Sequence, residues 1–427
     1  MNGQRILISG GRVVDPAQGL DGVLDVHIRD GRILALGSRP EGFVPEVEIR
    51  AGGQIVCPGF VDLCARFREP GFEYKSDIAS ESRAAAAAGI TTACCPPDTW
   101  PVIDTPAVAK LIQEKAGQAG KLRLLPIGAL TRGLKGQDLS DMNALKLAGC
   151  IAVGNASAPV ANNLVLRRAM EYAASHDLLV MVRPEDICLA DDGCVHEGPV
   201  STRLGLRGIP YAAETVAVAQ VLALIEHTGA RVHFGQLSSA RALRSIARAR
   251  DKGLPVTADV AIHHLHLTDR AVEGFDARYH VRPPLRDISD RDALREGVGT
   301  GVVAAICSDH QPHEPDTKLD AFPATEPGMA SLQTLLPLTL NLVEHGVLTL
   351  SQAIAALSSG PAGVLGISAG CLRAGAIADV CVFDSSASWC VDPQTWLSAG
   401  CNTPWWSETL RGRVTHTLSR GHLVHRS

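Results

Sequence analysis

The sequence lacks the features that would place the chain in a membrane, on a nucleic acid or in an oxidising compartment. No apolar run reaches the ~20 residues that span a bilayer, and the first segment, MNGQRILISGGRVV, predicts a strand rather than a signal peptide. The 40 Lys and Arg residues are outnumbered by 45 Asp and Glu residues, so no basic surface for nucleic acid or anionic lipid is indicated. The 12 cysteines include no Cys-x-x-Cys pair. In a chain of 427 residues this favours reduced, mostly buried thiols and a cytoplasmic protein.

Both ends of the chain are rich in predicted strands, whereas the middle is not. Near the N-terminus the segments ILISGGRVV, LDVHIRDGRILALG and VEIRAGGQIVCPG predict short strands, with Asp30-Gly31 as a hairpin turn. Near the C-terminus ADVCVFD and VTHTLSRGHLVHR have the same character. We therefore expect residues 1–56 and 366–427 to fold together into one small β-sandwich domain.

From residue 57 to residue 365, strand and helix patterns alternate. Eight apolar segments, each followed by a helical pattern, predict strands: VDLCARF, TTACCPP, KLRLLPIGAL, CIAVGN, LLVMVRPE, ARVHFGQLS, LPVTADVAIHHL and VVAAICSDH. Apolar strands between amphipathic helices are typical of a parallel sheet covered by helices. Eight such units predict an α/β fold of the (β/α)8 TIM-barrel type, in which active-site residues lie at the C-terminal ends of the strands.

Nine segments spread along the chain carry recognisable sequence motifs. They are PGFVDL, REPG, PPDTWPVID, MVRPED, VHFGQLSS, RPPLR, CSDHQPH, EPGMASLQTLLP and NTPWW. Through these motifs the sequence resembles cyclic amidohydrolases of the dihydroorotase type, within the amidohydrolase superfamily. The resemblance implies a TIM barrel whose mouth holds one or two divalent metal ions. In such enzymes the ions activate a water molecule and polarise the amide carbonyl.

Most of the metal-ligand positions that the resemblance implies have changed. These positions are Cys64, Arg66, Asn155, Ala156, Arg183, Gln236 and Asp309. In the family the first two form His-x-His, the next pair supplies a carboxylate or a carboxylated lysine, and the following two are histidines. Only Asp309 keeps its family identity. A guanidinium has no lone pair to give a cation, and zinc needs three or more protein ligands, so we predict no metal and no other cofactor.

Four further comparisons concern the substrate side of the site. Arg68 matches the family arginine that holds the substrate carboxylate, and His313 fits the motif Ser-Asp-His-Gln-Pro-His. Two family asparagines are replaced by Asp98 and Arg282, and a carboxylate at position 98 would repel an anionic substrate. We therefore regard Arg68, His313 and Asp309 as vestigial and expect no catalytic residue.

The arginines at former ligand positions suggest how the mouth survives without metal. A buried Asp309 with no cation beside it would be costly. We expect Arg66 or Arg183 to lie within hydrogen-bond range of Asp309 and to supply the missing positive charge.

A barrel that is kept after its ligands are lost is predicted to act through its surface. The resemblance points to the noncatalytic dihydroorotase-like subunits that accompany aspartate transcarbamoylase in some bacteria. It implies an inactive, structural partner of the transcarbamoylase catalytic subunits, in a dodecameric assembly of de novo pyrimidine biosynthesis. Two alternatives stay open: an active cyclic amidohydrolase with an unusual site, mononuclear through Asp309 and Cys64 or metal-free, and a ligand sensor in which Arg68 binds a carboxylate.

Overall fold

Strands from both ends of the chain form one sheet in the computed structural model, which describes residues 4–427. The first three residues of the predicted N-terminal strand therefore lie outside the described residues. The sheet has eight strands in the order β18-β17-β16-β5-β1-β2-β3, and β4 pairs with β1. Their bounds are β1 Arg5–Asp15, β2 Leu20–Arg29, β3 Arg32–Leu36, β4 Val47–Arg50, β5 Ile55–Pro58, β16 Val380–Cys390, β17 Thr409–Ser419 and β18 His422–Arg426.

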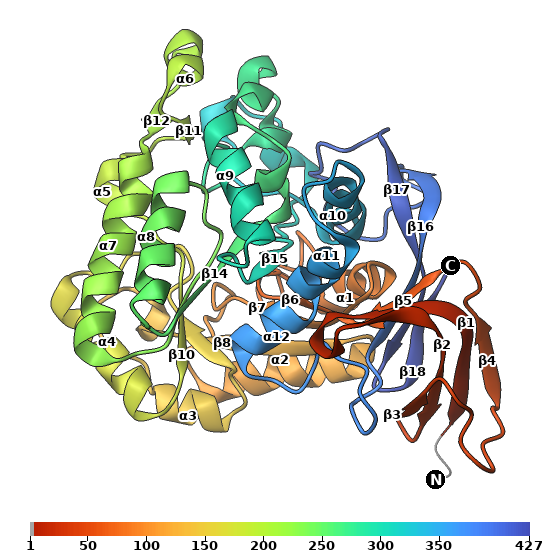
Figure 1. Cartoon of the computed structure of the whole chain (residues 1–427). Helices are drawn as coiled ribbons and strands as arrows, with labels where there is room; N and C mark the ends of the chain where they lie inside the picture. Colours follow the sequence, from red (N-terminus) through yellow and green to blue (C-terminus); the bar gives the residue numbers. More distant parts are fainter. Residues whose placement is uncertain (1–3) are drawn as a thin grey trace.

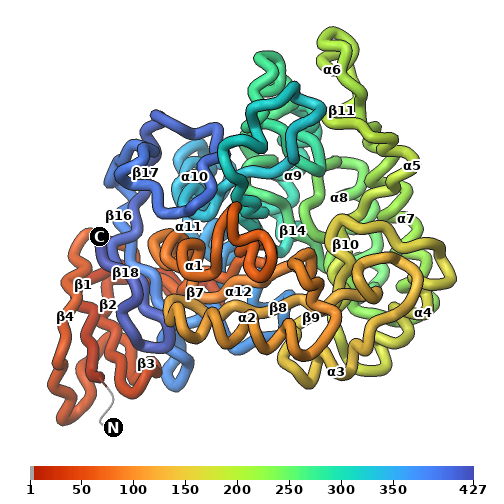
Figure 2. Tube along the Cα trace, turned by 180° about the vertical axis from the view of Figure 1, so that it is seen from behind, coloured from red at the N-terminus to blue at the C-terminus, as the bar shows by residue number. Residues whose placement is uncertain are grey.

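The two ends of the chain meet where β16 runs antiparallel to β5, with Cys381 opposite Cys57. Figures 1 and 2 show these N-terminal and C-terminal strands together on one flank of the molecule. The predicted hairpin turn is present between β2 and β3, where Asp30 and Gly31 both have positive φ, 54° and 72°. The expectation that the two ends fold together is confirmed.

The eight predicted central strands form a parallel barrel. Their order is β6-β7-β8-β9-β10-β13-β14-β15, which follows the chain. Their bounds are β6 Phe60–Asp62, β7 Ile90–Cys95, β8 Arg123–Ala129, β9 Ala152–Gly154, β10 Leu179–Val182, β13 Val232–Phe234, β14 Val256–Ala261 and β15 Ala305–Cys307. Beyond β6 and β15, Ala65 and His310 form a parallel bridge, so the last strand returns to the first.

Helices cover the outside of the barrel (Figure 1). The helices predicted between the strands are α1 Ile78–Ala87, α2 Pro106–Ala119, α3 Met142–Leu147, α4 Asn163–Ser175, α7 Tyr211–Thr228, α8 Ala240–Asp251, α9 Ile288–Gly299 and α10 Leu335–Glu344. Several begin at a side chain that accepts a backbone N–H, such as Asp77 for α1, Asn162 for α4 and Ser239 for α8. The amphipathic pattern that predicts these helices is thus matched by local capping.

Some elements have no counterpart in the prediction. They are α5 Ile187–Ala190, α6 Pro199–Leu204, α11 Leu350–Leu357 and α12 Ser359–Leu365, with the two-residue strands β11 Val195–His196 and β12 Gly208–Ile209. The segment from α5 to β12 forms an arm, and α6 stands away from the barrel in both the cartoon and the Cα tube (Figures 1 and 2). Within residues 4–427, none of the helices combines the length and apolar character needed to cross a bilayer.

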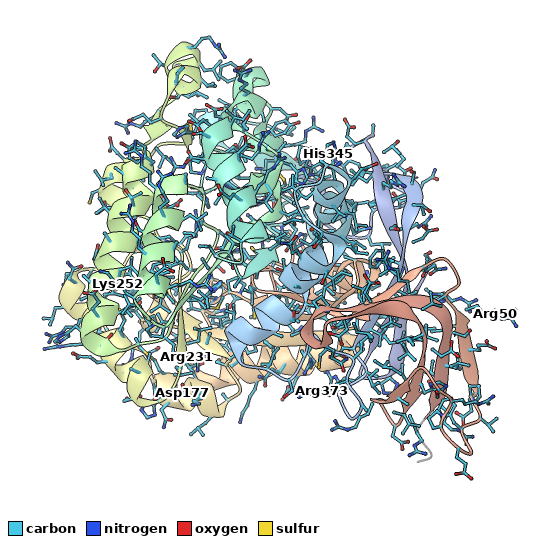
Figure 3. All side chains as sticks on the ribbon, viewed as in Figure 1. Arg50, Asp177, Arg231, Lys252, His345 and Arg373 are labelled. Atoms are coloured by element: carbon cyan, nitrogen blue, oxygen red, sulfur yellow. The ribbon has the colours of Figure 1, made fainter. Side chains whose placement is uncertain are left out.

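One hydrophobic core joins the barrel to the terminal sheet. It includes Phe60 and Phe234 from the barrel strands and Phe383 from β16, all fully buried. Burying an aromatic side chain of this kind contributes about 1.5–3 kcal/mol, which ties the sheet to the barrel. All 12 cysteines are free and most are buried, as expected. Charged side chains such as Lys252, Arg231 and Asp177 lie on the outer surface (Figure 3).

Candidate functional site

Most of the sequence-predicted positions meet at one end of the barrel, just beyond the C-terminal ends of its strands. They line a small cavity of about 40 Å³, and the predicted positions around it are Cys64, Arg66, Ala156, Arg183 and Gln236. Asp309 lies beside them, because its Oδ1 is 3.4 Å from Nη1 of Arg66 and 3.6 Å from Sγ of Cys64. We call this region the mouth.

Asn155 points away from the mouth and holds a loop. Its Oδ1 accepts hydrogen bonds from the backbone and hydroxyl of Thr131, and its Nδ2 donates to the carbonyls of Ala158 and Pro159. Its side-chain polar atoms are therefore used between the loops that follow β8 and β9. The backbone of Asn155 lies next to Ala156 at the mouth, but the side chain of Asn155 does not line the cavity.

Arg66 links two carboxylates across the mouth. Its Nε donates to Oδ2 of Asp98 at 2.8 Å, and its Nη1 lies 3.4 Å from Oδ1 of Asp309. Its side chain is only 8% exposed, so burial alone would lower the pKa of the guanidinium, yet the adjacent carboxylates outweigh burial and raise that pKa. Burial also acts to raise the pKa of Asp98, but the charge of Arg66 outweighs it and leaves that pKa lowered. Both charges of this pair are stabilised by each other.

Asp309 and Cys64 titrate differently from this pair. Burial raises the pKa of Asp309, and the nearby charges of Arg66 and Arg183 only partly offset it. Burial, followed by the negative charge of Asp309, raises the pKa of the Cys64 thiol well above its ordinary value. Asp309 also accepts hydrogen bonds from Gln311 Nε2, at 3.2 Å to each oxygen. The expected pairing of Asp309 with an arginine is made by Arg66, at a distance slightly longer than an ideal charged hydrogen bond.

Arg183 does not bond to Asp309. Its Nη1 donates to the hydroxyl of Ser157, and its Nη2 lies 3.5 Å from Oε2 of Glu185. Glu185 is held more closely by Arg282, whose Nε is 2.7 and 3.0 Å from the two carboxylate oxygens. Arg66 and Arg183, the two arginines that the sequence predicts at former ligand positions, thus have different partners.

The backbone around the mouth is unusual for residues other than glycine. Arg68, Ala156, Gln236 and Asp309 all have positive φ, between 44° and 61°. A left-handed conformation costs an L-residue about 1–2 kcal/mol. Such strained residues concentrate at functional sites, so the backbone of the mouth has the strained conformation that is typical of an active or binding site.

Arg68 and His313 pack against the same loop. Nε of Arg68 donates to the carbonyl of Pro312 at 3.0 Å, and burial lowers the pKa of Arg68 to about 10. Burial, helped by the charges of Arg68 and Lys75, lowers the pKa of His313 to about 2. The neutral imidazole accepts from Nζ of Lys75 at Nδ1 and donates to the carbonyl of Pro327 at Nε2, at 3.2 and 3.1 Å. Lys75 also pairs with Glu326 at 2.6 Å.

Two buried acids inside the barrel escaped the sequence interpretation. Asp62 accepts hydrogen bonds from the backbone and hydroxyl of Ser308, and Asp259 accepts from Gln236 N and pairs with Nε2 of His233 at 2.8 Å. Burial raises the pKa of Asp62 to about 7. Their signal in the sequence is a charged residue within an apolar strand, as in FVD and VTADVA.

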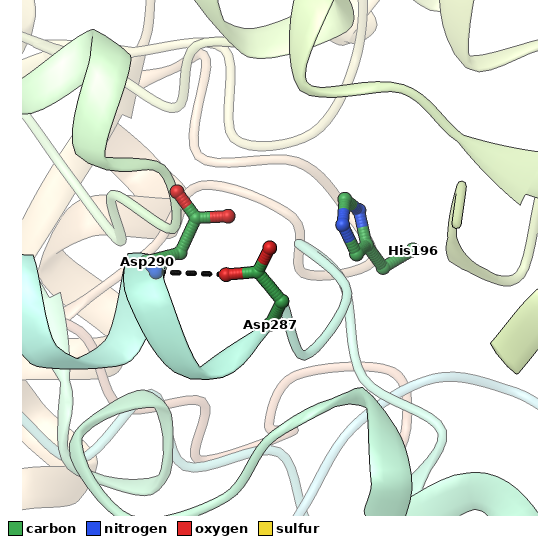
Figure 4. Close-up of side chains that lie close together, drawn as sticks. All are labelled: His196, Asp287 and Asp290. Carbon is green, nitrogen blue, oxygen red and sulfur yellow. Dashed lines mark hydrogen bonds between the residues drawn. The ribbon is translucent and has the colours of Figure 1, made fainter. Parts of the chain in front are cut away.

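A second cluster lies beneath the arm, where His196, Asp287 and Asp290 place possible metal-ligand atoms within 4.8 Å of one another (Figure 4). The two carboxylates already serve helix ends. Asp287 accepts from the backbone of Ser289 and Asp290, and Asp290 accepts from the N–H of Ala240 at the start of α8. Nη1 of Arg286 lies 3.1 Å from Nδ1 of His196, so the positive charge beside this cluster is already supplied by the guanidinium of Arg286. Burial and this charge lower the pKa of His196 to about 4.

Comparison with known proteins agrees with the fold and the motifs. The sequence profile of the family described as dihydro-orotase-like matches residues 53–242. A protein of Pseudomonas aeruginosa described as "Dihydroorotase-like protein" is 50% identical over 420 residues, covering 98% of this chain and 99% of its own length. A protein of Syntrophotalea carbinolica described as "Dihydroorotase" is 44% identical over 422 residues, covering 99% of each chain.

The solved structure of an L-hydantoinase (dihydropyrimidinase) from Arthrobacter aurescens superposes with a TM-score of 0.89. It covers 100% of this chain and 96% of its own, at 21% identity, which supports the amidohydrolase fold. The two sequence matches cover nearly all of this chain and nearly all of each relative. Because relatives at 50% and 44% identity cover nearly the whole chain, the chain belongs to the dihydroorotase-like family.

Proposed function

We propose that this chain is a catalytically inactive dihydroorotase homologue that supports the assembly and activity of aspartate transcarbamoylase in the cytoplasm. The observation that carries the proposal is the place of Arg66, whose guanidinium lies between Asp98 and Asp309 where the family resemblance expects metal ligands. The partner is taken from the resemblance to transcarbamoylase-associated subunits.

The residues of the mouth do not fit a divalent metal. Asp309 lies beside two donors, the guanidinium of Arg66 and the amide of Gln311, and the thiol of Cys64 is the one potential metal ligand that we find beside it among the described residues. A dication beside Asp309 would meet the fixed positive charge of Arg66 at short range.

The second candidate is an active cyclic amidohydrolase with an unusual site. It is favoured by the left-handed backbone kept at Arg68, Ala156, Gln236 and Asp309, and by the 44% identity to a relative described as "Dihydroorotase". In that case Asp309 and Cys64, whose Oδ1 and Sγ are 3.6 Å apart, are the remaining candidates for a mononuclear site.

Metal content and dihydroorotase turnover of the purified chain separate the two candidates. The proposal predicts no stoichiometric zinc and no turnover. It predicts the same for Cys64→His/Arg66→His, because the positions of Arg183 and Gln236 still lack histidine. About one zinc per chain that is removed by a chelator together with an activity would contradict the proposal.

A further inference from the structure

A groove runs outward from the mouth between the loop after β9 and the helices α4, α5 and α7. It has a volume of about 490 Å³, within the range of small-molecule sites. Apolar side chains form much of its wall, among them Val160, Leu166, Met181, Ile187, Ala217 and Val221. We call it the outer groove.

Arg183 lies where the outer groove meets the mouth, because it lines both cavities. Its side chain is only 10% exposed. Its Nε is buried and has no hydrogen-bond partner, while Nη1 donates to a neutral hydroxyl, that of Ser157. The side chain is therefore buried with incomplete hydrogen bonding, at the inner end of an apolar space.

The nearby carboxylates are engaged elsewhere. Glu185 is held by Arg282 at 2.6–3.0 Å and reaches Arg183 only at 3.5 Å. Asp186 accepts from the N–H of Leu189 and begins α5. Asp309 bonds to Arg66 and Gln311. The charge of Arg183 is thus only partly compensated by these acids, and an anion in the outer groove would complete it.

We propose that the outer groove binds a small organic carboxylate with an apolar body. The planar guanidinium of Arg183 suits a carboxylate head. The apolar body would lie along Ile187, Ala217 and Val221. This site does not include Arg68 and does not depend on the proposed role in assembly. Its test is therefore independent of the test of the proposed function.

Isothermal titration of the full chain with octanoate tests the proposal, with octanamide as the uncharged match. Octanoate should bind, and octanamide at least ~10-fold more weakly, since the uncharged amide cannot form a charged hydrogen bond with Arg183. Arg183→Met should lose the same ~10-fold for octanoate. Ala217→Trp should block both ligands by filling the groove.

Two matched variants serve as controls. Arg203→Met changes an exposed arginine on the arm that pairs with Glu273, and Ala223→Trp places the same bulk on the exposed side of α7. Both should bind octanoate as the unaltered chain does. Equal affinity for octanoate and octanamide, no binding of octanoate, or unchanged binding by Ala217→Trp would each overturn the proposal. So would unchanged octanoate binding by Arg183→Met, and if that variant does not fold, the other comparisons decide.

Discussion

Arg66 is the residue on which the charge balance of the mouth depends. It pairs with Asp98 at 2.8 Å and with Asp309 at 3.4 Å, and all three lie at the edge of the barrel interior. Removing one partner of a buried ion pair is strongly destabilising because the other charge is left without compensation. Arg66 therefore has a structural role that an exposed arginine does not have.

The Arg66→Met variant should lower the free energy of unfolding by ~3–5 kcal/mol, measured by urea denaturation. Adding Asp98→Asn and Asp309→Asn to it should recover much of that loss, because no unpaired carboxylate then remains. The control is Arg12→Met, which breaks the exposed pair with Asp21 and should cost at most ~1 kcal/mol. An Arg66→Met cost no larger than that of the control would show that Arg66 does not balance the mouth.

Asp62 should make stability depend on pH. Burial raises its pKa from 3.8 to about 7, so the folded chain binds this proton more tightly than the unfolded chain. The contribution is fully present below about pH 4 and is lost as the pH rises through about 7. At 1.36 kcal/mol per pH unit, it amounts to ~4 kcal/mol at most.

Between about pH 4 and pH 7, Asp62→Asn should therefore gain stability relative to the unaltered chain, as measured by denaturation at each pH. Asparagine keeps an oxygen for the N–H groups of Cys64 and Ser308. The exposed Asp138→Asn should follow the unaltered chain across the same range. Parallel stability curves for Asp62→Asn and the unaltered chain would rule out a raised pKa at Asp62.

At the scale of elements, the end of α1 depends on a close approach. Gly89 follows the helix with φ 82°, and a Cβ there would lie 2.5 Å from Sγ of Cys381 and 2.9 Å from the ring of Phe60. The turn thus places the helix end directly against β16 and β6. A side chain at this position meets both backbone strain and overpacking.

Gly89→Ala should cost ~2–4 kcal/mol of unfolding free energy, by thermal or chemical denaturation. Gly229→Ala is the matched variant: it ends α7 with φ 65° and has open space around it. It should cost only the ~1–2 kcal/mol of the left-handed backbone. If both variants cost the same, the contact with Cys381 contributes nothing.

Most helices and strands were predictable, because short apolar segments, amphipathic patterns and capping residues can be recognised from neighbouring residues in the sequence. The arm from α5 to β12 was not, since its two-residue strands carry no periodic signal. The mouth was predictable as a set of positions, through motifs such as MVRPED and CSDHQPH. The side-chain pairing in the mouth was only partly predictable. Arg66 pairs with Asp98 from the end of a neighbouring strand, and Asn155 bonds to Thr131 and Ala158 in the loops after β8 and β9; both depend on side-chain direction in the folded chain.

At the scale of the whole molecule, the chain combines two parts, the terminal sheet and the barrel. The two ends still meet in one sheet, with β16 paired to β5, and the barrel returns on itself through Ala65 and His310. The changes at the mouth leave this architecture intact. Under the proposed function, this intact architecture would let the chain act through its surface.

Co-expression with the cognate aspartate transcarbamoylase tests the central claim most directly. Size-exclusion chromatography and transcarbamoylase assays would be run with and without this chain, and with Cys64→His as a control that leaves the surface and Arg66 unchanged. The account predicts one large hetero-oligomer with either form, and loss of transcarbamoylase assembly or activity when the chain is absent. A transcarbamoylase that elutes and turns over identically without this chain would contradict it.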